Sequence, residues 1–220
     1  MSVASAATRS EVAASLGRAP IVAVVRHSDE REAARQARLF AGAGLELIEI
    51  TFTVPNAVRL VETLLAERPV GAPWKIGMGT VTQRSRAEAA VRAGAEFLVS
   101  PNTSPAVAEL ARQHQLYLVL GALTPTELVC AAELGADLLK VYPLPPVGGP
   151  AYLAVVRQPL GDLPPMLAGG GFGVEEIPAY RRAGAVAFGI GAPLLAASDE
   201  ASRARIRRAL ALARGEEGGG

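Results

Sequence analysis

The sequence predicts an α/β protein of one domain, a (β/α)8 barrel (TIM barrel) with an extra N-terminal helix. Two observations carry this prediction: short apolar runs alternate with amphipathic stretches, and glycines recur where each amphipathic stretch ends. Such alternation favours parallel strands joined by right-handed helical crossovers. Eight such units in about 200 residues fit a compact closed barrel. We expect a helix and a disordered start over 1–18, the barrel over 19–214 and a disordered tail over 215–220.

Each predicted strand is a short run rich in β-branched or other apolar residues. The first, Pro-Ile-Val-Ala-Val-Val-Arg at 20–26, is continuously apolar, as in a strand buried on both faces. We expect strands at 20–26, 45–51, 75–78, 96–99, 116–120, around Lys140, at 165–168 and at 186–190. Helices are expected near 11–16, at 28–40, from residues 83, 104, 124, 150 and 174, and at 199–214.

The helix-to-strand junctions resemble one another. Gly44, Gly94, Gly135 and Gly184 each stand where a helix needs a left-handed C-terminal residue. An open doubly wound sheet is the alternative fold. It is disfavoured because the residues after the first strand, 26–29, lack the G-x-G-x-x-G turn of that fold.

Composition limits the classes of partner. The net charge is +1 with both signs scattered, so we expect a small-molecule substrate and no nucleic-acid partner. Cys130 is the single cysteine, which excludes an internal disulfide, and His27 and His114 do not form a metal set. No signal-peptide core or bilayer-length apolar run is present. We expect a soluble cytoplasmic protein with no membrane contact, no metal and no cofactor.

Lys140 is the first candidate catalytic residue. Only Lys75 and Lys140 are lysines among the 22 basic residues, and Lys140 stands in an apolar stretch, 134–143. Arginine does not deprotonate, whereas an amine can lose its proton and attack a carbonyl. Burial disfavours the ammonium form and is one route to a Schiff-base lysine. The alternative is a lysine whose stem packs and whose ammonium reaches water.

Glu49 is the second candidate. It is flanked by apolar residues, and strand alternation groups its side chain with those of Leu47 and Thr51. A buried carboxylate is costly unless paired or hydrogen-bonded, so an inward Lys140 is a suitable partner. The alternative is a glutamate on a solvated face. The same alternation turns Tyr142 inward with Lys140, where it either packs over the site or belongs to the core.

Other candidates lie where strands end, since reacting groups of such barrels come from these ends. Thr80 follows a glycine pair, and residues 100–102 close the fourth strand. Glycine-rich loops at 168–173 and 189–191 follow the last two strands, the usual place for a phosphate cradle in this fold. The alternative for each is a plain turn or close backbone packing.

Five motifs together with the two glycine loops give the chain a resemblance to a known family. The motifs are Leu-Ile-Glu-Ile-Thr at 47–51, Gly-Met-Gly-Thr-Val at 77–81, Leu-Val-Ser-Pro at 98–101, Leu-Thr-Pro-Thr-Glu at 123–127 and Leu-Lys-Val-Tyr-Pro at 139–143, with the glycine loops at 168–173 and 189–191 completing the pattern. Over residues 19–195 the chain resembles the 2-keto-3-deoxy-6-phosphogluconate (KDPG) and 4-hydroxy-2-oxoglutarate (KHG) aldolases. The resemblance implies a homotrimeric class I aldolase that forms pyruvate and glyceraldehyde 3-phosphate.

The resemblance also implies residue roles. Lys140 would form the Schiff base and Glu49 would be the acid/base. The implied substrate-binding residues are Thr80 for the pyruvate carboxylate, Pro101 for the pocket wall, and Gly169, Gly170 and Gly191 for the phosphate.

The chain departs from the family pattern at three positions. Thr53 stands where many members have an arginine, although some share this variant. Arg26 matches an arginine of the phosphogalactonate branch and could supply the missing charge. Ala168 and Ala192 replace a usual threonine and serine, which removes two hydroxyl donors.

Three alternatives to a KDPG aldolase stay open. The first is an aldolase for 4-hydroxy-2-oxoglutarate or for a phosphogalactonate-type substrate. The second is a barrel isomerase or epimerase in which Glu49 is the base and Lys140 is purely electrostatic. The third is a non-catalytic binding protein on an aldolase scaffold.

Overall fold

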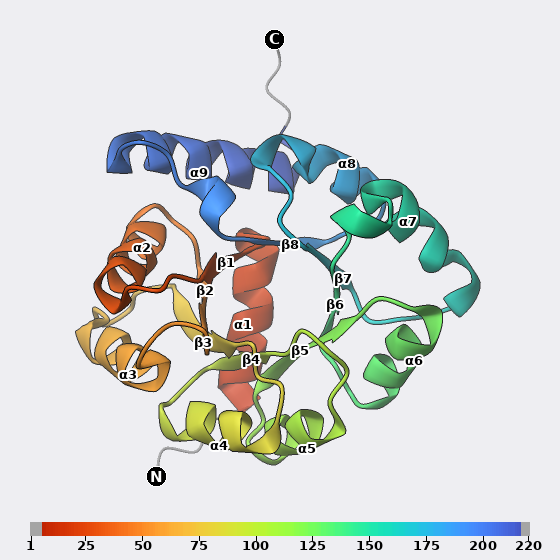
Figure 1. The fold of residues 1–220 in the computed structure, drawn as a ribbon, viewed down its shortest axis with the longest axis horizontal. Helices are drawn as coiled ribbons and strands as arrows, with labels where there is room; N and C mark the ends of the chain where they lie inside the picture. Colours follow the sequence, from red (N-terminus) through yellow and green to blue (C-terminus); the bar gives the residue numbers. More distant parts are fainter. Residues whose placement is uncertain (1–5, 217–220) are drawn as a thin grey trace.

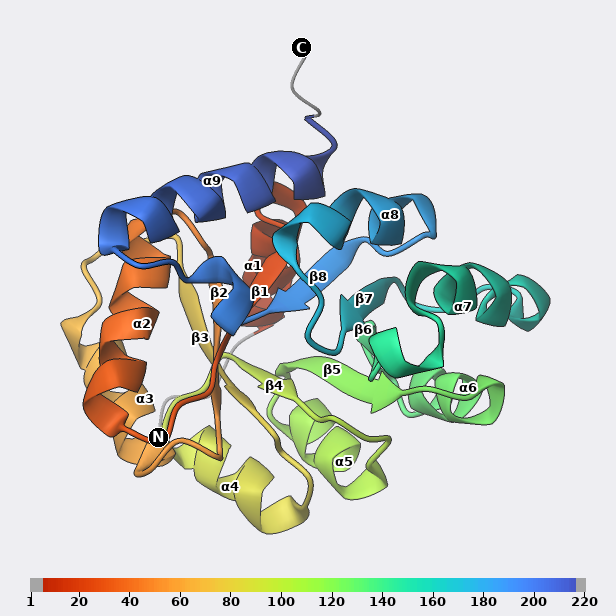
Figure 2. The same cartoon turned by 45° about the horizontal axis from the view of Figure 1, so that its top comes forward.

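A computed structural model describes residues 6–216. Its eight parallel strands close into a barrel in which each strand pairs with the next and β8 pairs with β1. Figure 1 looks along the barrel, with helices around the ring of strands and α1 seen through it, and Figure 2 shows the same arrangement tilted. The predicted barrel with an N-terminal helix is therefore confirmed.

The elements alternate along the chain. The strands are β1 (Ile21–Val25), β2 (Leu47–Thr51), β3 (Lys75–Gly79), β4 (Phe97–Val99), β5 (Tyr117–Ala122), β6 (Leu138–Val141), β7 (Met166–Gly169) and β8 (Ala187–Ile190). The α-helices are α1 (Ala6–Arg18), α2 (Glu30–Gly42), α3 (Ala57–Glu67), α4 (Arg84–Arg92), α5 (Pro105–Gln113), α6 (Pro125–Glu133), α7 (Gly149–Val156), α8 (Ile177–Arg182) and α9 (Asp199–Arg214). Short 3-10 helices include η4 (Ala192–Leu194), directly after the β8 loop.

Three details differ from the sequence prediction. Helix α3 is absent from the predicted elements, and β5 extends two residues beyond its predicted end, to Ala122. Gly215 and Glu216, within the predicted disordered tail, donate backbone hydrogen bonds that close α9. The rest of that tail, 217–220, and the start, 1–5, lie outside the described residues.

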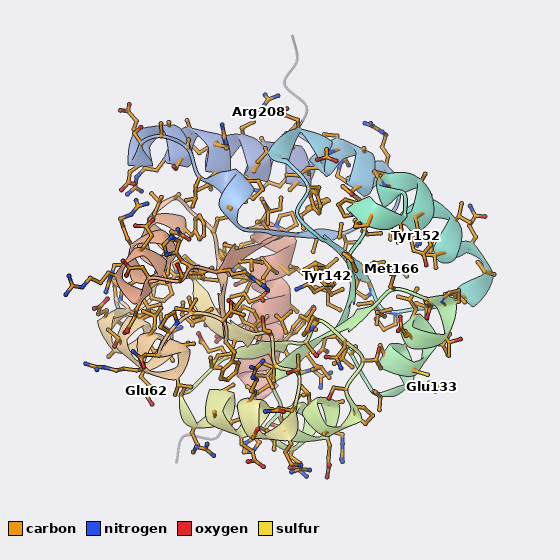
Figure 3. The ribbon with its side chains drawn as sticks, viewed as in Figure 1. Glu62, Glu133, Tyr142, Tyr152, Met166 and Arg208 are labelled. Carbon is orange, nitrogen blue, oxygen red and sulfur yellow. The ribbon has the colours of Figure 1, made fainter. Side chains whose placement is uncertain are left out.

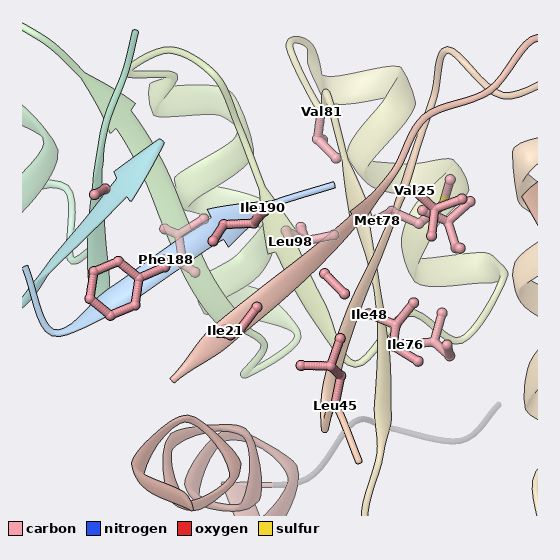
Figure 4. Close-up of a cluster of buried hydrophobic side chains, with 14 of the residues drawn as sticks. Ile21, Val25, Leu45, Ile48, Ile76, Met78, Val81, Leu98, Phe188 and Ile190 are labelled. Carbon is pink, nitrogen blue, oxygen red and sulfur yellow. The ribbon is translucent and has the colours of Figure 1, made fainter. Parts of the chain in front are cut away.

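Two hydrophobic cores follow from the alternation of side chains along the strands. The outer core lies between strands and helices, and Figure 4 shows part of it around Ile48, Ile76 and Phe188. The inner core lies inside the barrel and includes Leu47 and Leu138. Membership in one core or the other therefore tells which face of a strand each side chain occupies.

Helix α1 closes the N-terminal end of the barrel. Its Val12 and Leu16 belong to the inner core, so its apolar side faces the barrel interior. Three ion pairs connect α1 to residues at or just before the N-terminal ends of strands: Arg9 with Asp137, Glu11 with Lys75, and Arg18 with Glu46. The opposite, C-terminal end is thus the open one. Within residues 6–216, none of the helices has the length and apolar content needed to cross a membrane.

The start of α6 gives a prediction about stability and pH. Glu127 accepts backbone hydrogen bonds from Leu123 and Thr124, which hold the pKa of its carboxyl below the ordinary value of 4.5. Because the folded-state pKa is depressed, this stabilisation is present above about pH 4.5 and is lost as pH falls through the folded value. We expect Glu127→Gln to lower the free energy of unfolding by about 0.3–1.5 kcal/mol at pH 7 and by less at low pH.

Urea unfolding of both proteins between pH 3 and 7 measures this difference. Glu133→Gln is the matched control, because Glu133 is exposed at the other end of α6 and makes no hydrogen bond with the described residues. A wild-type advantage over Glu127→Gln that does not shrink toward pH 3 would contradict the assignment.

Candidate active site

Lys140 lies on β6 and points into the barrel. It aligns with Gly121 of β5 and Leu167 of β7, and its neighbour two residues earlier, Leu138, belongs to the inner core. The side chain is partly exposed, at the open end of the barrel above that core. Its Nζ lies 5.3 Å from the centroid of the Tyr142 ring. Figure 3 shows Tyr142 within the circle of strands, so the amine and this ring share the barrel mouth.

The two lysines have different surroundings. Lys75 ends 2.5 Å from Glu11 and 3.7 Å from Glu96, at the closed end of the barrel. Lys140 has no ion pair or hydrogen bond with any residue between 6 and 216. An amine that no carboxylate holds is free to react with a bound molecule.

Glu49 lies across the barrel from Lys140. Three strands separate β2 from β6 in either direction around the closed sheet. The Glu49 side chain alternates with inward Leu47 and is 2% exposed. It does not form the expected ion pair with Lys140, nor a hydrogen bond with another described residue. A buried carboxylate without a protein partner is costly, which marks this position as one kept for a purpose other than stability.

Glycines clear space around the two side chains. A Cβ at Gly79 would stand 1.8 Å from Oε1 of Glu49, so this carboxylate lies directly against the β3 backbone. A Cβ at Gly169 would stand 3.3 Å from Cε of Lys140. At Gly121, beside Lys140 in register, a Cβ would stand 2.2 Å from the Pro101 carbonyl. Any larger residue at Gly79 or Gly121 would displace a group of the site.

A cavity of about 350 Å³ opens beside Lys140. It runs from the amine toward the ends of β7, β8 and β1. Its lining comprises Val24, Arg26, Lys140, Tyr142, Gly170, Gly171, Phe172, Gly189, Ile190, Gly191, Ala192 and Pro193. Of the predicted site residues it thus gathers Lys140, Arg26, Tyr142, Gly170 and Gly191, while the carboxylate of Glu49 lies outside this lining.

Arg26 contributes a guanidinium group to the lining of this cavity. It is exposed, and it forms no ion pair with any described residue. Thr51 donates a hydrogen bond of 2.9 Å to the Val25 carbonyl, and its hydroxyl lies 2.7 Å from that of Thr53. Arg26, which could supply the charge missing at Thr53, therefore lies with Thr53 at the ends of two adjacent strands, β1 and β2.

Thr80 and Pro101 lie at the ends of β3 and β4. Thr80 directly follows Gly79, against which Glu49 rests, and its backbone is left-handed with φ of 60°. The backbone of Pro101 crosses over Gly121, the neighbour of Lys140. Both residues therefore border the barrel mouth, on the side away from Arg26 and the glycine loops.

Comparison with known proteins places this geometry in a family. The family model described as KDPG and KHG aldolase matches residues 12–209. The chain belongs to the KDPG and KHG aldolase family. Members of this family are aldolases, so the protein is an enzyme of the lyase class.

Relatives of this aldolase have different stated substrates. A Rhizobium meliloti (strain 1021) protein named probable 2-dehydro-3-deoxy-6-phosphogalactonate aldolase is 33% identical over 88% of this chain and 90% of its own. A 2-dehydro-3-deoxy-phosphogluconate aldolase of Treponema pallidum (strain Nichols) is 31% identical over 66% and 67%. A solved 4-hydroxy-2-oxoglutarate/2-dehydro-3-deoxyphosphogluconate aldolase from TTHB1 has a TM-score of 0.78 and 32% identity, covering 90% of this chain and 96% of that one.

The structure separates the two positions where this aldolase lacks a usual hydroxyl. Ala168 is fully buried and belongs to the outer core, on the helix side of β7. Ala192 is exposed and lines the cavity. Of the two replaced positions, only residue 192 therefore borders the space in which a ligand of the aldolase would lie.

Sequence reasoning missed several residues of the site. Gly121 was overlooked because the fifth strand was expected to end at residue 120, yet an inward glycine in a strand indicates a close approach. Gly171, Phe172 and Gly189 line the cavity within loops that were recognised only as glycine-rich. Gly169, predicted to hold phosphate, is not among the residues that line this cavity, and a Cβ at its position would stand 3.3 Å from Cε of Lys140.

Proposed function

We propose that this protein is a class I aldolase that cleaves a 2-keto-3-deoxy-6-phospho sugar acid to pyruvate and glyceraldehyde 3-phosphate through a Schiff base on Lys140. The observation that carries the proposal is the unpaired amine of Lys140 in a cavity that continues to Arg26 and the two glycine loops. A keto acid at the amine would place its phosphorylated end toward those loops.

The chemistry needs one amine and one acid/base. The Lys140 amine adds to the C2 ketone and water leaves, which gives an iminium that withdraws electrons. Glu49 accepts the proton of the 4-hydroxyl, the C3–C4 bond breaks, and its electron pair forms the enamine as the aldehyde departs. Glu49 then returns that proton to C3. Water hydrolyses the resulting iminium, which releases pyruvate and the free amine.

The remaining predicted residues have binding roles. Thr80 would hold the pyruvate carboxylate, and Pro101 would line the pocket near the pyruvyl carbon. Gly170 and Gly191 would offer backbone N–H groups to the phosphate, as glycine loops do in this fold. Tyr142 would cover the Schiff base, a role that its position 5.3 Å from Nζ supports.

The stereochemistry of the substrate is the finer question. Relatives act, by their names, on phosphogalactonate, phosphogluconate or hydroxyoxoglutarate compounds. Arg26 in the cavity supports a phosphorylated or otherwise dianionic substrate, because a guanidinium binds phosphate through paired hydrogen bonds.

A substrate panel tests the proposal. Pyruvate release is measured with the phosphogluconate and phosphogalactonate keto-deoxy acids, with their unphosphorylated forms and with 4-hydroxy-2-oxoglutarate. We expect kcat/KM to be highest for a phosphorylated compound. Equal or higher values for hydroxyoxoglutarate would assign the enzyme to that substrate instead, and no pyruvate from any compound would refute the aldolase mechanism.

Arg26 gives a sharper prediction about the phosphate. Loss of a charge-assisted hydrogen bond costs about 1.5–3 kcal/mol, so Arg26→Ala should raise KM for the phosphorylated substrate about 10- to 100-fold. KM for its unphosphorylated form should change little. Arg112→Ala is the control, since Arg112 is exposed on α5, away from the cavity. Equal losses on both substrates would show that Arg26 does not recognise the phosphate.

We also propose that the enzyme is a homotrimer, as its family resemblance implies. Exposed valines on one part of the barrel, Val155 of α7 at 63% and Val186 before β8 at 48%, support an association surface there. Light scattering with size exclusion measures the mass directly, and a monomer at micromolar concentration would contradict the trimer.

A further inference from the structure

The turn that carries Thr80 is held in an unfavourable conformation. Thr80 is one of three non-glycine residues with positive φ among those described, and it is β-branched. A left-handed backbone costs a β-branched residue of order 1–3 kcal/mol, and such residues persist only where their surroundings hold them. The Thr80 hydroxyl makes no hydrogen bond with a described residue, so it remains available to a ligand.

Arg86 stabilises this turn through side-chain hydrogen bonds. Its guanidinium Nη1 donates a hydrogen bond of 2.9 Å to the Thr80 carbonyl and one of 3.3 Å to the Thr82 hydroxyl. Both bonds come from the first turn of α4, the helix that follows β3 in the chain. The arginine therefore fixes the direction of the strained peptide unit.

The same guanidinium reaches the end of β2. It lies 5.4 Å from the centroid of the Phe52 ring, a distance suited to a cation–π contact. The Phe52 N–H donates a hydrogen bond of 2.9 Å to the Gly79 carbonyl, on the peptide that precedes Thr80. Arg86 thus joins the ends of the strands that carry Glu49 and Thr80.

Arg86 differs from the neighbouring arginine of the same helix. Arg84 is exposed and pairs with Glu88 and Glu109. Arg86 is half-buried and has no carboxylate partner among residues 6–216. The partners of its guanidinium are a backbone carbonyl and an aromatic ring. Arg86 therefore positions a loop and does not balance surface charge.

We propose that Arg86 is a positioning residue of this aldolase, one that holds Thr80 in the conformation that receives the keto-acid carboxylate. The inference rests on the proposed function of Thr80. Arg86 acts through the backbone of Thr80 and does not itself touch the substrate.

The test measures pyruvate capture on the full-length enzyme. Pyruvate and cyanoborohydride inactivate a Schiff-base enzyme at a rate that saturates with pyruvate. We expect Arg86→Ala to raise the half-saturating pyruvate concentration about 10-fold, as for loss of a hydrogen bond to a charged group, with a maximal rate near that of the wild type. Arg86→Lys keeps a donor and should lie between the two. Arg84→Ala, on the same helix, should match the wild type.

Repeating the measurement in a Thr80→Gly variant distinguishes a positioning role of Arg86 from a general structural role. Glycine adopts the left-handed conformation without strain, so Thr80→Gly removes the need for the contact. We expect the double variant Arg86→Ala/Thr80→Gly to have a half-saturating pyruvate concentration within about 2-fold of that of Thr80→Gly alone.

Failure of the proposed function and failure of the positioning role of Arg86 give different results. If the wild type is not trapped by pyruvate, the proposed function is refuted and this inference with it. If the wild type is trapped but Arg86→Ala has the same half-saturation, or shows the same 10-fold change in the Thr80→Gly background, only the positioning role is refuted. Should Arg86→Ala fail to fold, Arg86→Lys in both backgrounds provides the same comparison.

Discussion

Lys140→Met should reduce kcat for pyruvate release by about 10⁴-fold or more, because it removes the nucleophile and leaves only binding contributions. Methionine has similar length and suits a site that borders the inner core, so the barrel should keep its melting temperature within a few degrees. Steady-state pyruvate release and circular dichroism measure the two quantities.

Lys140→Arg distinguishes a Schiff base from an electrostatic role. Arginine retains the positive charge but forms no imine, so this variant should be as inactive as Lys140→Met. The matched control is Lys75→Arg, which keeps the ion pair with Glu11 at the closed end and should retain activity. Substantial activity in Lys140→Arg would favour an isomerase or epimerase in which the lysine is only a charge.

Glu49→Gln should lower kcat by about 10²–10⁴-fold, the usual contribution of a general acid/base. The substitution preserves shape, which matters because the carboxylate lies against the β3 backbone at Gly79. Glu49→Gln should still form the Schiff base with pyruvate. Exchange of the pyruvate methyl protons in D₂O, which requires proton transfer at the carbon that becomes C3, should fall by a similar factor.

The control for Glu49 lies on the same segment of chain. Glu46 pairs with Arg18 at the closed end of the barrel, so Glu46→Gln should leave both exchange and turnover near wild type. If Glu49→Gln exchanged pyruvate protons at the wild-type rate, another group would have to be the acid/base.

The barrel was predictable because its signals are local. Continuous apolar runs identify strands covered on both sides, and a positive φ was correctly expected at Gly44, Gly94, Gly135 and Gly184. The inward face of β6 followed from side-chain alternation once Lys140 was singled out. These features depend on neighbouring residues rather than on contacts between distant ones.

The details of the site depend on distant contacts and were harder to predict. No sequence pattern states that Gly121 admits the Pro101 backbone or that Glu49 rests on Gly79. The pairing expected between Glu49 and Lys140 does not form, because β2 and β6 lie on opposite sides of the closed sheet. The hydrogen bond of Arg86 to the Thr80 carbonyl likewise depends on the turn after β3. The cytoplasmic location and the trimer stay predictions.

The most direct measurement is reduction of the enzyme with borohydride in the presence of pyruvate, followed by proteolysis and mass spectrometry. We expect one reduced pyruvyl adduct per chain, on the peptide that contains Lys140, and none in Lys140→Arg. Modification of Lys75 instead, or a wild-type chain that carries no adduct at saturating pyruvate, would contradict this expectation.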